Sequence, residues 1–453
     1  MLLTTRERTG ALLAVLLTGQ AMAAMDGSIV TVALPSIQRD LGAGDAALQL
    51  IVSGYLLTLG VLIVTGARLG DLLGHRRAFL TGLAGFTLAS LLCGLAPAAP
   101  VLVVARVAQA TAAALMMPQV FSLIQLRFTG SALRRAIGLY SMVLALGVAL
   151  GQLLGGLVVG ADLFGLSWRP AFLINVPVGA VLMVAGPVVL PRAPRMARRL
   201  DLVGVGLLST AMTALVAPLI FGREYGWPLW TWLSLVTGVG LLAVFVRFER
   251  LIARRGGLPL LDLDVLRPRG VKPGLIACLL VMGCYTAFLF AFTLHLQEHL
   301  GYGPLGAGLA FVPYATGFAA LSLTWARLPE RNQAALPVAG PVVFAAVALI
   351  MAAVAGDGWA SVPAAPLLFA AGAGHAAGYS PLIARLSATV GPGRASALSA
   401  LNHTGPLLAS VMAIAGLGGL YLAAGLSWTL AAVATLLLLG SAAAALAGTT
   451  PSP

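Results

Sequence analysis

Long apolar runs, separated by short charged or Gly/Pro-rich breaks, fill the 453-residue sequence. About 20 apolar residues are enough to cross the hydrocarbon core of a bilayer as a helix. We therefore predict an all-α membrane protein with fourteen spans, each boundary given to within about 2–4 residues. The spans are 10–34, 47–69, 78–97, 100–126, 136–161, 168–190, 202–222, 229–248, 272–296, 304–326, 334–355, 359–384, 395–424 and 426–447.

The composition excludes an ordinary water-soluble domain. Hydrophobic residues make up 60% of the chain and charged residues 9%, and the mean hydropathy is +0.99. Soluble domains carry roughly 25% charged residues, so this chain lacks the polar surface to cover itself in water. The lipid bilayer is its expected partner. The three cysteines lie inside apolar runs and imply no disulfide framework.

The basic residues alternate with the predicted spans. Of the 27 Lys and Arg residues, 23 fall on one side of the membrane, Arg39, Arg169 and Arg223 fall on the other, and Arg106 lies inside a span. Positive charge accumulates on the cytoplasmic side of membrane proteins. We therefore predict a multi-pass protein of the cell membrane with both termini in the cytoplasm. The net charge of +13 is interpreted as a topology signal, with no nucleic-acid partner.

The longest charged loop lies near residues 249–272, between the eighth and ninth spans. Six spans precede Pro191 and six follow this loop, with two spans in between. We predict an N-terminal six-helix bundle over 1–190, two additional helices over 191–256, and a C-terminal six-helix bundle over 257–453.

Two ionisable residues lie well inside predicted spans, Asp26 in the first and Arg106 in the fourth. A charge in the hydrocarbon costs about 2.5–3.5 kcal/mol on insertion scales, so such residues are functional candidates. One hypothesis is that both line a water-filled cavity, where Asp26 binds and releases a proton as its pairing with Arg106 changes. The alternative is a static ion pair that holds two helices together.

Other polar and aromatic residues in the spans are candidates for the wall of a substrate cavity. Interhelical hydrogen bonding or packing would also explain any one of them. Glu298, His375 and His403 are also candidates for a second proton carrier. The cavity candidates are Tyr55, Gln109, Met117, Gln152, Asn175, Phe288, Phe292, His375, Tyr379 and Asn402.

The sequence from His295 to His299 has the HxxEH spelling of a zinc-protease motif, with Glu298 as its acid. A catalytic zinc needs a third protein ligand, and no partner cluster follows downstream. A membrane-embedded zinc hydrolase that uses His295, Glu298 and His299 is therefore only an alternative. The simpler interpretation is that these residues close the outer end of the ninth span. An ATP-driven pump is excluded, because Lys272 is the single lysine and precedes Pro273, which leaves no phosphate-binding loop.

Several motifs follow one another along the chain. A glycine-rich basic loop follows the second span, an RxxQ element lies in the fourth span, and regularly spaced glycines lie in the fifth. Two further stretches, 25–35 in the first span and 168–177 at the start of the sixth, add to the pattern. The matching residues are Gly66, Gly70, Asp71, Gly74, Arg76 and Arg77 in the loop, Arg106 and Gln109 in the RxxQ element, and Gly147, Gly151 and Gly155 in the fifth span. Together these motifs resemble the major facilitator superfamily, specifically its fourteen-helix drug/proton antiporters, over nearly the whole chain.

The resemblance implies two six-helix bundles built from inverted three-helix repeats, two additional helices, and alternating access to a central site. It implies export of hydrophobic drugs or natural-product antibiotics in exchange for protons, without enzymatic activity, cofactor or metal. Asp26 matches the first-helix acid, Arg106 the fourth-helix arginine, and the loop and fifth-span residues the gating elements. We expect a monomer whose partners are protons and a small hydrophobic molecule. Proton-linked import of a small solute is a further alternative.

Overall fold

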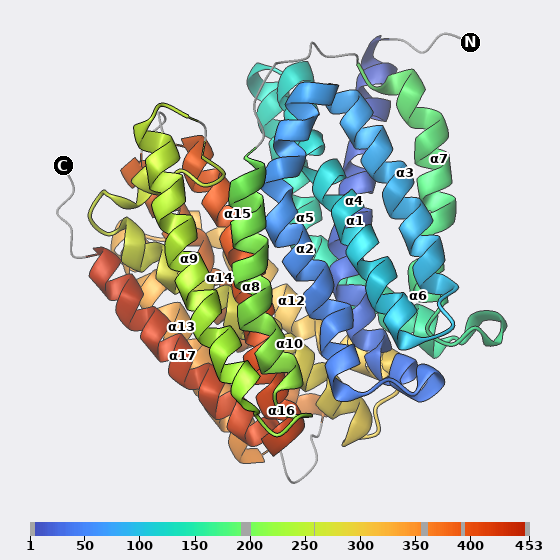
Figure 1. Ribbon diagram of the computed structural model, residues 1–453, viewed down its shortest axis with the longest axis vertical. Helices are drawn as coiled ribbons and strands as arrows, with labels where there is room; N and C mark the ends of the chain where they lie inside the picture. Colours follow the sequence, from blue (N-terminus) through green and yellow to red (C-terminus); the bar gives the residue numbers. More distant parts are fainter. Residues whose placement is uncertain (1–4, 192–200, 258, 355–360, 391–394, 449–453) are drawn as a thin grey trace. The chain divides into compact units, whose positions relative to one another are not determined.

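The computed structural model describes residues 5–191, 201–257, 259–354, 361–390 and 395–448, and helices dominate these ranges (Figure 1). A helix satisfies its backbone N–H and C=O groups within one segment, which a chain crossing lipid requires. No β-strand occurs within the described ranges, and the predicted all-α class is confirmed.

The contacts between helices divide the chain into two compact units. Unit 1 falls within residues 1–205 and includes 303–308. In this unit α3 packs on α4, α2 on α4, and α1 on α5. Its helices are α1 (Thr5–Leu41), α2 (Asp45–Leu73), α3 (His75–Gly94), α4 (Ala99–Arg127), α5 (Gly130–Gly160), α6 (Pro170–Leu173) and α7 (Asn175–Val189).

Unit 2 falls within residues 206–302 and 309–453. Here α13 packs on α14 and α17, α12 packs on α14, and α10 packs on α15 and α17. Its elements are α8 (Leu202–Phe221), α9 (Leu229–Arg254), the 3-10 turn η2 (Leu263–Leu266), α10 (Val271–Glu298), α11 (Pro304–Ala310), α12 (Val312–Thr324), α13 (Glu330–Val354), α14 (Ser361–Val390), α15 (Ala395–Ala413), α16 (Gly419–Ala424) and α17 (Leu426–Gly448). The start of α8 and most of α11 lie in ranges that group with unit 1.

Each of the fourteen predicted spans coincides with helical residues. Among the described residues, twelve helices are long and apolar enough to cross a membrane. The sixth predicted span is divided between α6 and α7, and the tenth between α11 and α12. Pro313 stands in the first turn of α12, where the missing N–H of proline costs no helical hydrogen bond. The thirteenth contains a π-helical stretch, Ile414–Gly418, between α15 and α16.

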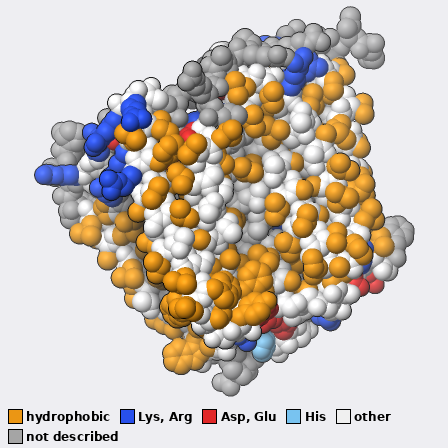
Figure 2. All heavy atoms as spheres, in the orientation of Figure 1, with side chains coloured by type: hydrophobic (Ala, Val, Ile, Leu, Met, Phe, Trp, Pro, Cys, Tyr) orange, Lys and Arg blue, Asp and Glu red, His pale blue; other side chains and the backbone are white. Residues whose placement is uncertain are grey.

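Apolar side chains cover the outer faces of the helices, as expected of a surface that faces lipid. On α7, Val181, Val184 and Val188 are exposed, at the three- and four-residue spacing of one helix face. Figure 2 shows hydrophobic side chains along the sides of the helices, with Lys and Arg gathered near helix ends. Such a distribution suits helices whose middle parts lie in hydrocarbon.

Candidate functional site

Unit 1 contains a buried ion pair between Asp26 on α1 and Arg106 on α4. Nη1 of Arg106 donates to Oδ2 of Asp26, and both side chains are completely buried. Removing a charged group from water is costly, and a close partner of opposite charge offsets much of that cost. The two ionisable residues that the sequence analysis singled out are therefore partners in this structure.

The other carboxylate oxygen of Asp26 accepts two hydrogen bonds from side-chain amides. Nε2 of Gln109 on α4 donates to Oδ1 at 2.8 Å, and Nδ2 of Asn175, the first residue of α7, donates to it at 3.1 Å. Three helices thus meet at one carboxylate. Because Arg106, Gln109 and Asn175 all donate to this one side chain, Asp26 connects α1 to both α4 and α7.

The guanidinium of Arg106 is held on its other sides by α2, α4 and α6. Its Nε donates to the backbone oxygen of Ile51 at 3.1 Å, and Nη1 also donates to Oε1 of Gln109 at 2.6 Å. Its Cζ lies 4.0 Å from the ring centre of Tyr55 and 5.6 Å from that of Phe172. Aromatic faces attract a cation, so these rings replace part of the lost hydration.

Gln109 connects the ion pair to α3. Its Nε2 also donates to Oγ of Ser90 at 2.8 Å, and Sγ of Cys93 lies 3.7 Å from its Oε1. Ser90, Cys93 and Phe172 are site residues that were not among the candidates predicted from the sequence. The spacing of Phe172 and Asn175, three residues apart, could have indicated a shared face, but Ser90 and Cys93 carried no distinguishing pattern in an apolar span.

The loop motif between α2 and α3 forms a second polar cluster in unit 1. Nδ1 of His75 lies 2.8 Å from Oε1 of Gln119 on α4, and Nε2 of His75 lies 3.6 Å from Asp71. Gln119 also donates through Nε2 to the backbone oxygen of Gly66 at 2.8 Å. Gly74 makes the turn between the helices with φ of 88°, a conformation that L side chains disfavour.

The remaining residues of that motif lie around this cluster. A Cβ at Gly66 would collide with the backbone oxygen of Ala114, and one at Gly70 with the side chain of Gln119. Arg76 donates through Nη2 to the backbone oxygen of Pro187 on α7 at 2.6 Å, whereas Arg77 is exposed. The motif therefore joins α2, α3, α4 and α7 at one end of unit 1.

The glycines predicted for the fifth span form a smooth face on α5 against α1. A Cβ at Gly147 would lie 2.6 Å from Cβ of Ala24, and one at Gly155 would lie 2.9 Å from Cγ1 of Ile29. Gly151 faces Met25, the residue directly before Asp26. Gln152 on the same helix donates to the backbone oxygen of Ser28 at 3.4 Å. The backbones of α5 and α1 are therefore closely packed at residues that both precede and follow Asp26.

Unit 2 contains a buried aromatic cluster around His375 of α14. The ring of Tyr285 stacks on that of His375 with centres 4.6 Å apart, and the hydroxyl of Tyr314 lies 2.9 Å from Nδ1 of His375. Phe288 and Phe292 stack on each other with centres 5.4 Å apart, and Phe288 also stacks on Tyr314 at 5.9 Å. These side chains are in mutual contact in this structure.

Tyr379 of α14 also belongs to the aromatic cluster, because its ring centre lies 6.4 Å from that of His375. The hydroxyl of Tyr379 donates to Oδ1 of Asn402 at 3.1 Å. Met117 on α4 is half-buried, and the described contacts of the ion pair do not include it. The side chain of His403 lies outside the described residues.

The HxxEH residues lie at the end of α10. The rings of His295 and His299 stack with centres 5.0 Å apart, and Nδ1 of His299 lies 3.5 Å from the hydroxyl of Tyr421. Within the part of the chain that the structure describes, no group of three or more His, Cys, Asp or Glu side chains could hold a metal ion.

Comparison with known proteins gives one family and several relatives. A profile of the Major Facilitator Superfamily matches residues 16–413.

The chain is 37% identical over 352 residues to a probable actinorhodin transporter of Streptomyces coelicolor, which covers 77% of this chain and 61% of that protein. It is 39% identical over 347 residues to a puromycin resistance protein of Streptomyces alboniger, which covers 75% of this chain and 66% of that protein. A tetracenomycin C resistance and export protein of Streptomyces glaucescens is 38% identical over 299 residues, 65% of this chain and 54% of that protein. The chain thus spans between about half and two thirds of the length of these relatives.

Solved structures with the same fold include more distant proteins. A peptide transporter in complex with sulfate superposes with a TM-score of 0.69 at 16% identity, covering 96% of this chain and 94% of that one. A bacterial homologue of the human lysosomal transporter Spinster, inward-facing and occupied, also gives 0.69 at 16% identity, covering 98% and 97%. At such low identity these likenesses concern the fold alone.

Proposed function

Because the chain belongs to the Major Facilitator Superfamily, we propose that it is a proton-coupled exporter of hydrophobic drugs or natural-product antibiotics. Membership of the family confirms the predicted family and fold class. The relatives are named as a transporter, a resistance protein and a resistance and export protein, which supports transport rather than catalysis. The substrate, the proton coupling and the direction are our proposals.

The buried ion pair is the observation that carries the proposal. Asp26 is an acid without exposure to solvent, and its carboxylate contacts side chains from α4 and α7. Protonation removes its negative charge, so Asp26 loses most of its attraction to Arg106. A proton on this one group therefore weakens the connection of α1 to two other helices at once.

Arg106 keeps other partners when that attraction is lost. It still donates to the backbone of Ile51 and to Gln109, and it still lies over the ring of Tyr55. The cation is thus retained on α2 and α4 while α1 becomes free to shift along the glycine face of α5. This asymmetry allows protonation to change helix packing without leaving an unpartnered arginine.

We propose that the protein lies in the cell membrane with both termini in the cytoplasm and works as a monomer by alternating access. The distribution of basic residues supports the orientation. One proton moving down about 100 mV supplies roughly 2.3 kcal/mol, which sustains about a fortyfold gradient of a neutral substrate. A larger gradient requires a pH difference, a charged substrate or a second carrier, for which Glu298, His375 and His403 are the candidates.

We propose that the substrate is a largely apolar, aromatic-containing molecule. The aromatic side chains around His375 include Tyr379, whose hydroxyl donates to Asn402. They supply rings that stack on planar molecules and a few hydrogen-bonding atoms. Relatives named for actinorhodin, tetracenomycin C and puromycin support this class of compound.

The test is the variant Asp26→Asn. This substitution keeps the size of the side chain, but an amide does not bind or release a proton as a carboxyl group does. In energised inverted vesicles, addition of puromycin or of another compound from a toxicity panel should release protons from vesicles with the wild-type protein and not from those with the variant. Asp40→Asn is the matched control, since Asp40 lies on the same helix but is partly exposed and paired with Arg169 at 2.5 Å. Normal proton release by the Asp26 variant would refute the assigned role.

The same vesicles decide between export and import. Inverted vesicles expose the cytoplasmic face, so an exporter accumulates substrate when the interior is acidic. Accumulation in right-side-out vesicles instead would establish import of a small solute.

A further inference from the structure

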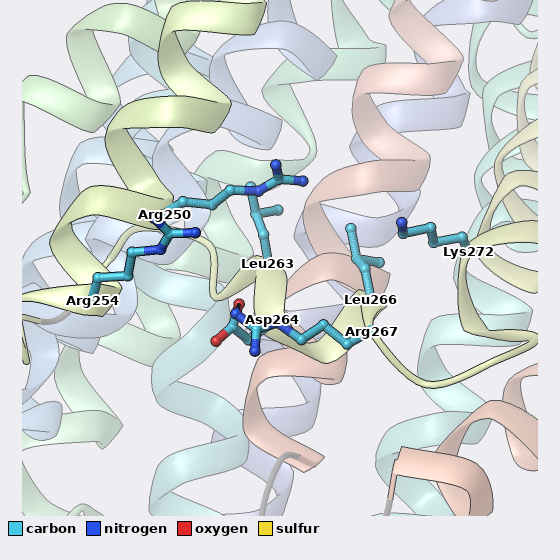
Figure 3. Close-up of a pocket in the computed structure, with 7 residues that line it drawn as sticks. All are labelled: Arg250, Arg254, Leu263, Asp264, Leu266, Arg267 and Lys272. Carbon is cyan, nitrogen blue, oxygen red and sulfur yellow. Dashed lines mark ion pairs between the residues drawn. The ribbon is translucent and has the colours of Figure 1, made fainter.

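A basic pocket of about 150 Å³ opens in unit 2 where α9 ends, η2 passes and α10 begins (Figure 3). The two arginines of α9 and the lysine of α10 approach it from opposite sides, with η2 between them. The lining residues are Arg250, Arg254, Leu263, Asp264, Leu266, Arg267 and Lys272. We refer to these seven residues as the basic pocket.

The charges of the basic pocket are not balanced. Its single acid, Asp264, pairs through Oδ1 with Nη2 of Arg267 at 3.0 Å. Among the described residues, Arg250, Arg254 and Lys272 have no ion pair with an acidic side chain. Three cationic groups thus surround one small cavity, and their mutual repulsion falls when an anion enters.

The pocket is built on a fixed segment. Oε2 of the buried Glu249 on α9 accepts a hydrogen bond from the backbone N–H of Leu261 at 2.8 Å. Asp262 caps η2 by accepting from the N–H of Asp264 at 3.0 Å, and Val265 is completely buried in the core beside Val271. Since both ends of η2 are held, the backbone between α9 and α10 follows a fixed path along the pocket.

The position of the pocket along the helices indicates the kind of anion. Arg250 and Arg254 lie in the last turns of α9, and Lys272 is the second residue of α10. Both helices are long and apolar enough to cross a membrane, so their adjoining ends lie at the level of the lipid headgroups. This step rests on the proposed membrane location. Leu263 and Leu266 add apolar surface beside the cations.

We propose that the basic pocket binds a phosphate group, and specifically the phosphate diester of an anionic phospholipid headgroup. Arginine presents parallel N–H donors that match two phosphate oxygens, and lysine adds a point charge. Basic pockets between membrane helices are suited to anionic headgroups, while the leucines contact the start of the acyl chains. Free phosphate offers the same oxygens without the acyl chains, so the two sources can be separated by experiment.

The test compares two triple variants with equal loss of charge. R250Q/R254Q/K272Q removes the cations of the pocket that lack an acidic partner. R247Q/R255Q/R269Q removes three exposed arginines of the same region that do not line the pocket. The full chain is purified in detergent, and thermal unfolding is followed as phosphatidylglycerol, phosphatidylcholine or inorganic phosphate is added. Single-lipid binding is measured in parallel by native mass spectrometry.

Phosphatidylglycerol should raise the unfolding temperature of the wild type and of the control triple variant, and phosphatidylcholine should not. The pocket triple variant should bind phosphatidylglycerol about tenfold more weakly or worse. Inorganic phosphate acting through the same residues would identify a soluble anion as the ligand. Equal loss of binding in both triple variants would overturn the site, because it would mean a diffuse charge effect.

Single variants cover the case in which the triple pocket variant does not fold. Arg254→Gln and Lys272→Gln should each lose part of the response to phosphatidylglycerol, whereas Arg255→Gln should keep it. An unchanged response in both pocket variants would refute the proposal. Transport activity enters none of these measurements, so their result is separate from that of the proton-release test.

Discussion

At the scale of single residues, Gln109 forms hydrogen bonds with both members of the buried pair. Its amide nitrogen donates to Asp26 and to Ser90, while its amide oxygen accepts from Arg106. An amide is suited to this position because it carries donors and an acceptor without adding charge. An apolar replacement leaves both charged groups with fewer partners in a place that water does not reach.

We expect Gln109→Leu to destabilise the protein by about 1–3 kcal/mol, the cost of leaving buried polar groups without a partner. The unfolding temperature of the purified protein in detergent measures this effect. Gln125→Ala is the control, because Gln125 is an exposed residue of the same helix. Equal unfolding temperatures for wild type and Gln109→Leu would contradict the bridging role.

The sequence predicts residues of the site when they contrast with their surroundings. Asp26 and Arg106 stand out because charge is rare in apolar spans, and Gln109 and Asn175 are conspicuous amides. Which of them touch depends on how α1, α4 and α7 are placed in space, and spacing within one helix does not contain that information. Ser90 and Phe172 are ordinary residues of membrane helices, so only the structure identifies them as partners.

At the scale of elements, the contact of α5 with α1 places the glycine motif beside the segment of α1 that carries Asp26. The glycines of α5 lie against Ala24, Met25 and Ile29, which flank Asp26. Small residues allow two backbones to approach closely and leave no side chains to interlock. The packing of α1 on α5 at this face therefore depends on the absence of side chains at these glycines.

We expect Gly151→Ala to destabilise the protein by about 1–3 kcal/mol and to reduce transport, since overpacking forces neighbouring groups to shift. The added Cβ would lie 2.5 Å from the backbone oxygen of Met25. Gly240→Ala on α9 is the control, because a Cβ there meets nothing within 4 Å. Unfolding temperature and drug resistance of a pump-deficient host measure the two effects. Resistance and stability equal to the control would show that this contact is not tight.

Hydropathy predicts where helices lie but not how they are interrupted. All fourteen ranges contain helix, because an apolar run of that length has few other ways to satisfy its backbone. The break between α6 and α7 places Phe172 and Asn175 beside the ion pair, and the π-helical stretch 414–418 follows α15. Such local departures depend on tertiary contacts, which composition does not encode.

At the scale of the whole molecule, helix contacts divide the chain differently from its charge pattern. The charged loops predict one boundary near residue 191 and another near residue 257. The contacts group the chain from residue 206 to 302 with its C-terminal part, including most of α8 and all of α9. Loops mark where the chain leaves the membrane, whereas units are defined by which helices touch.

The orientation of the whole chain is tested by two single-cysteine variants. Arg223 and Arg255 are both exposed. Arg223 precedes the start of α9 at Leu229 and Arg255 directly follows its end, and the charge pattern assigns Arg223 to the outer side and Arg255 to the cytoplasm. The three native cysteines are buried, so they contribute little background labelling. A membrane-impermeant maleimide should label Arg223→Cys in intact cells and Arg255→Cys only in inverted vesicles. The reverse pattern would place both termini outside, and protons entering the cell would then reach Asp26 from the opposite end of α1.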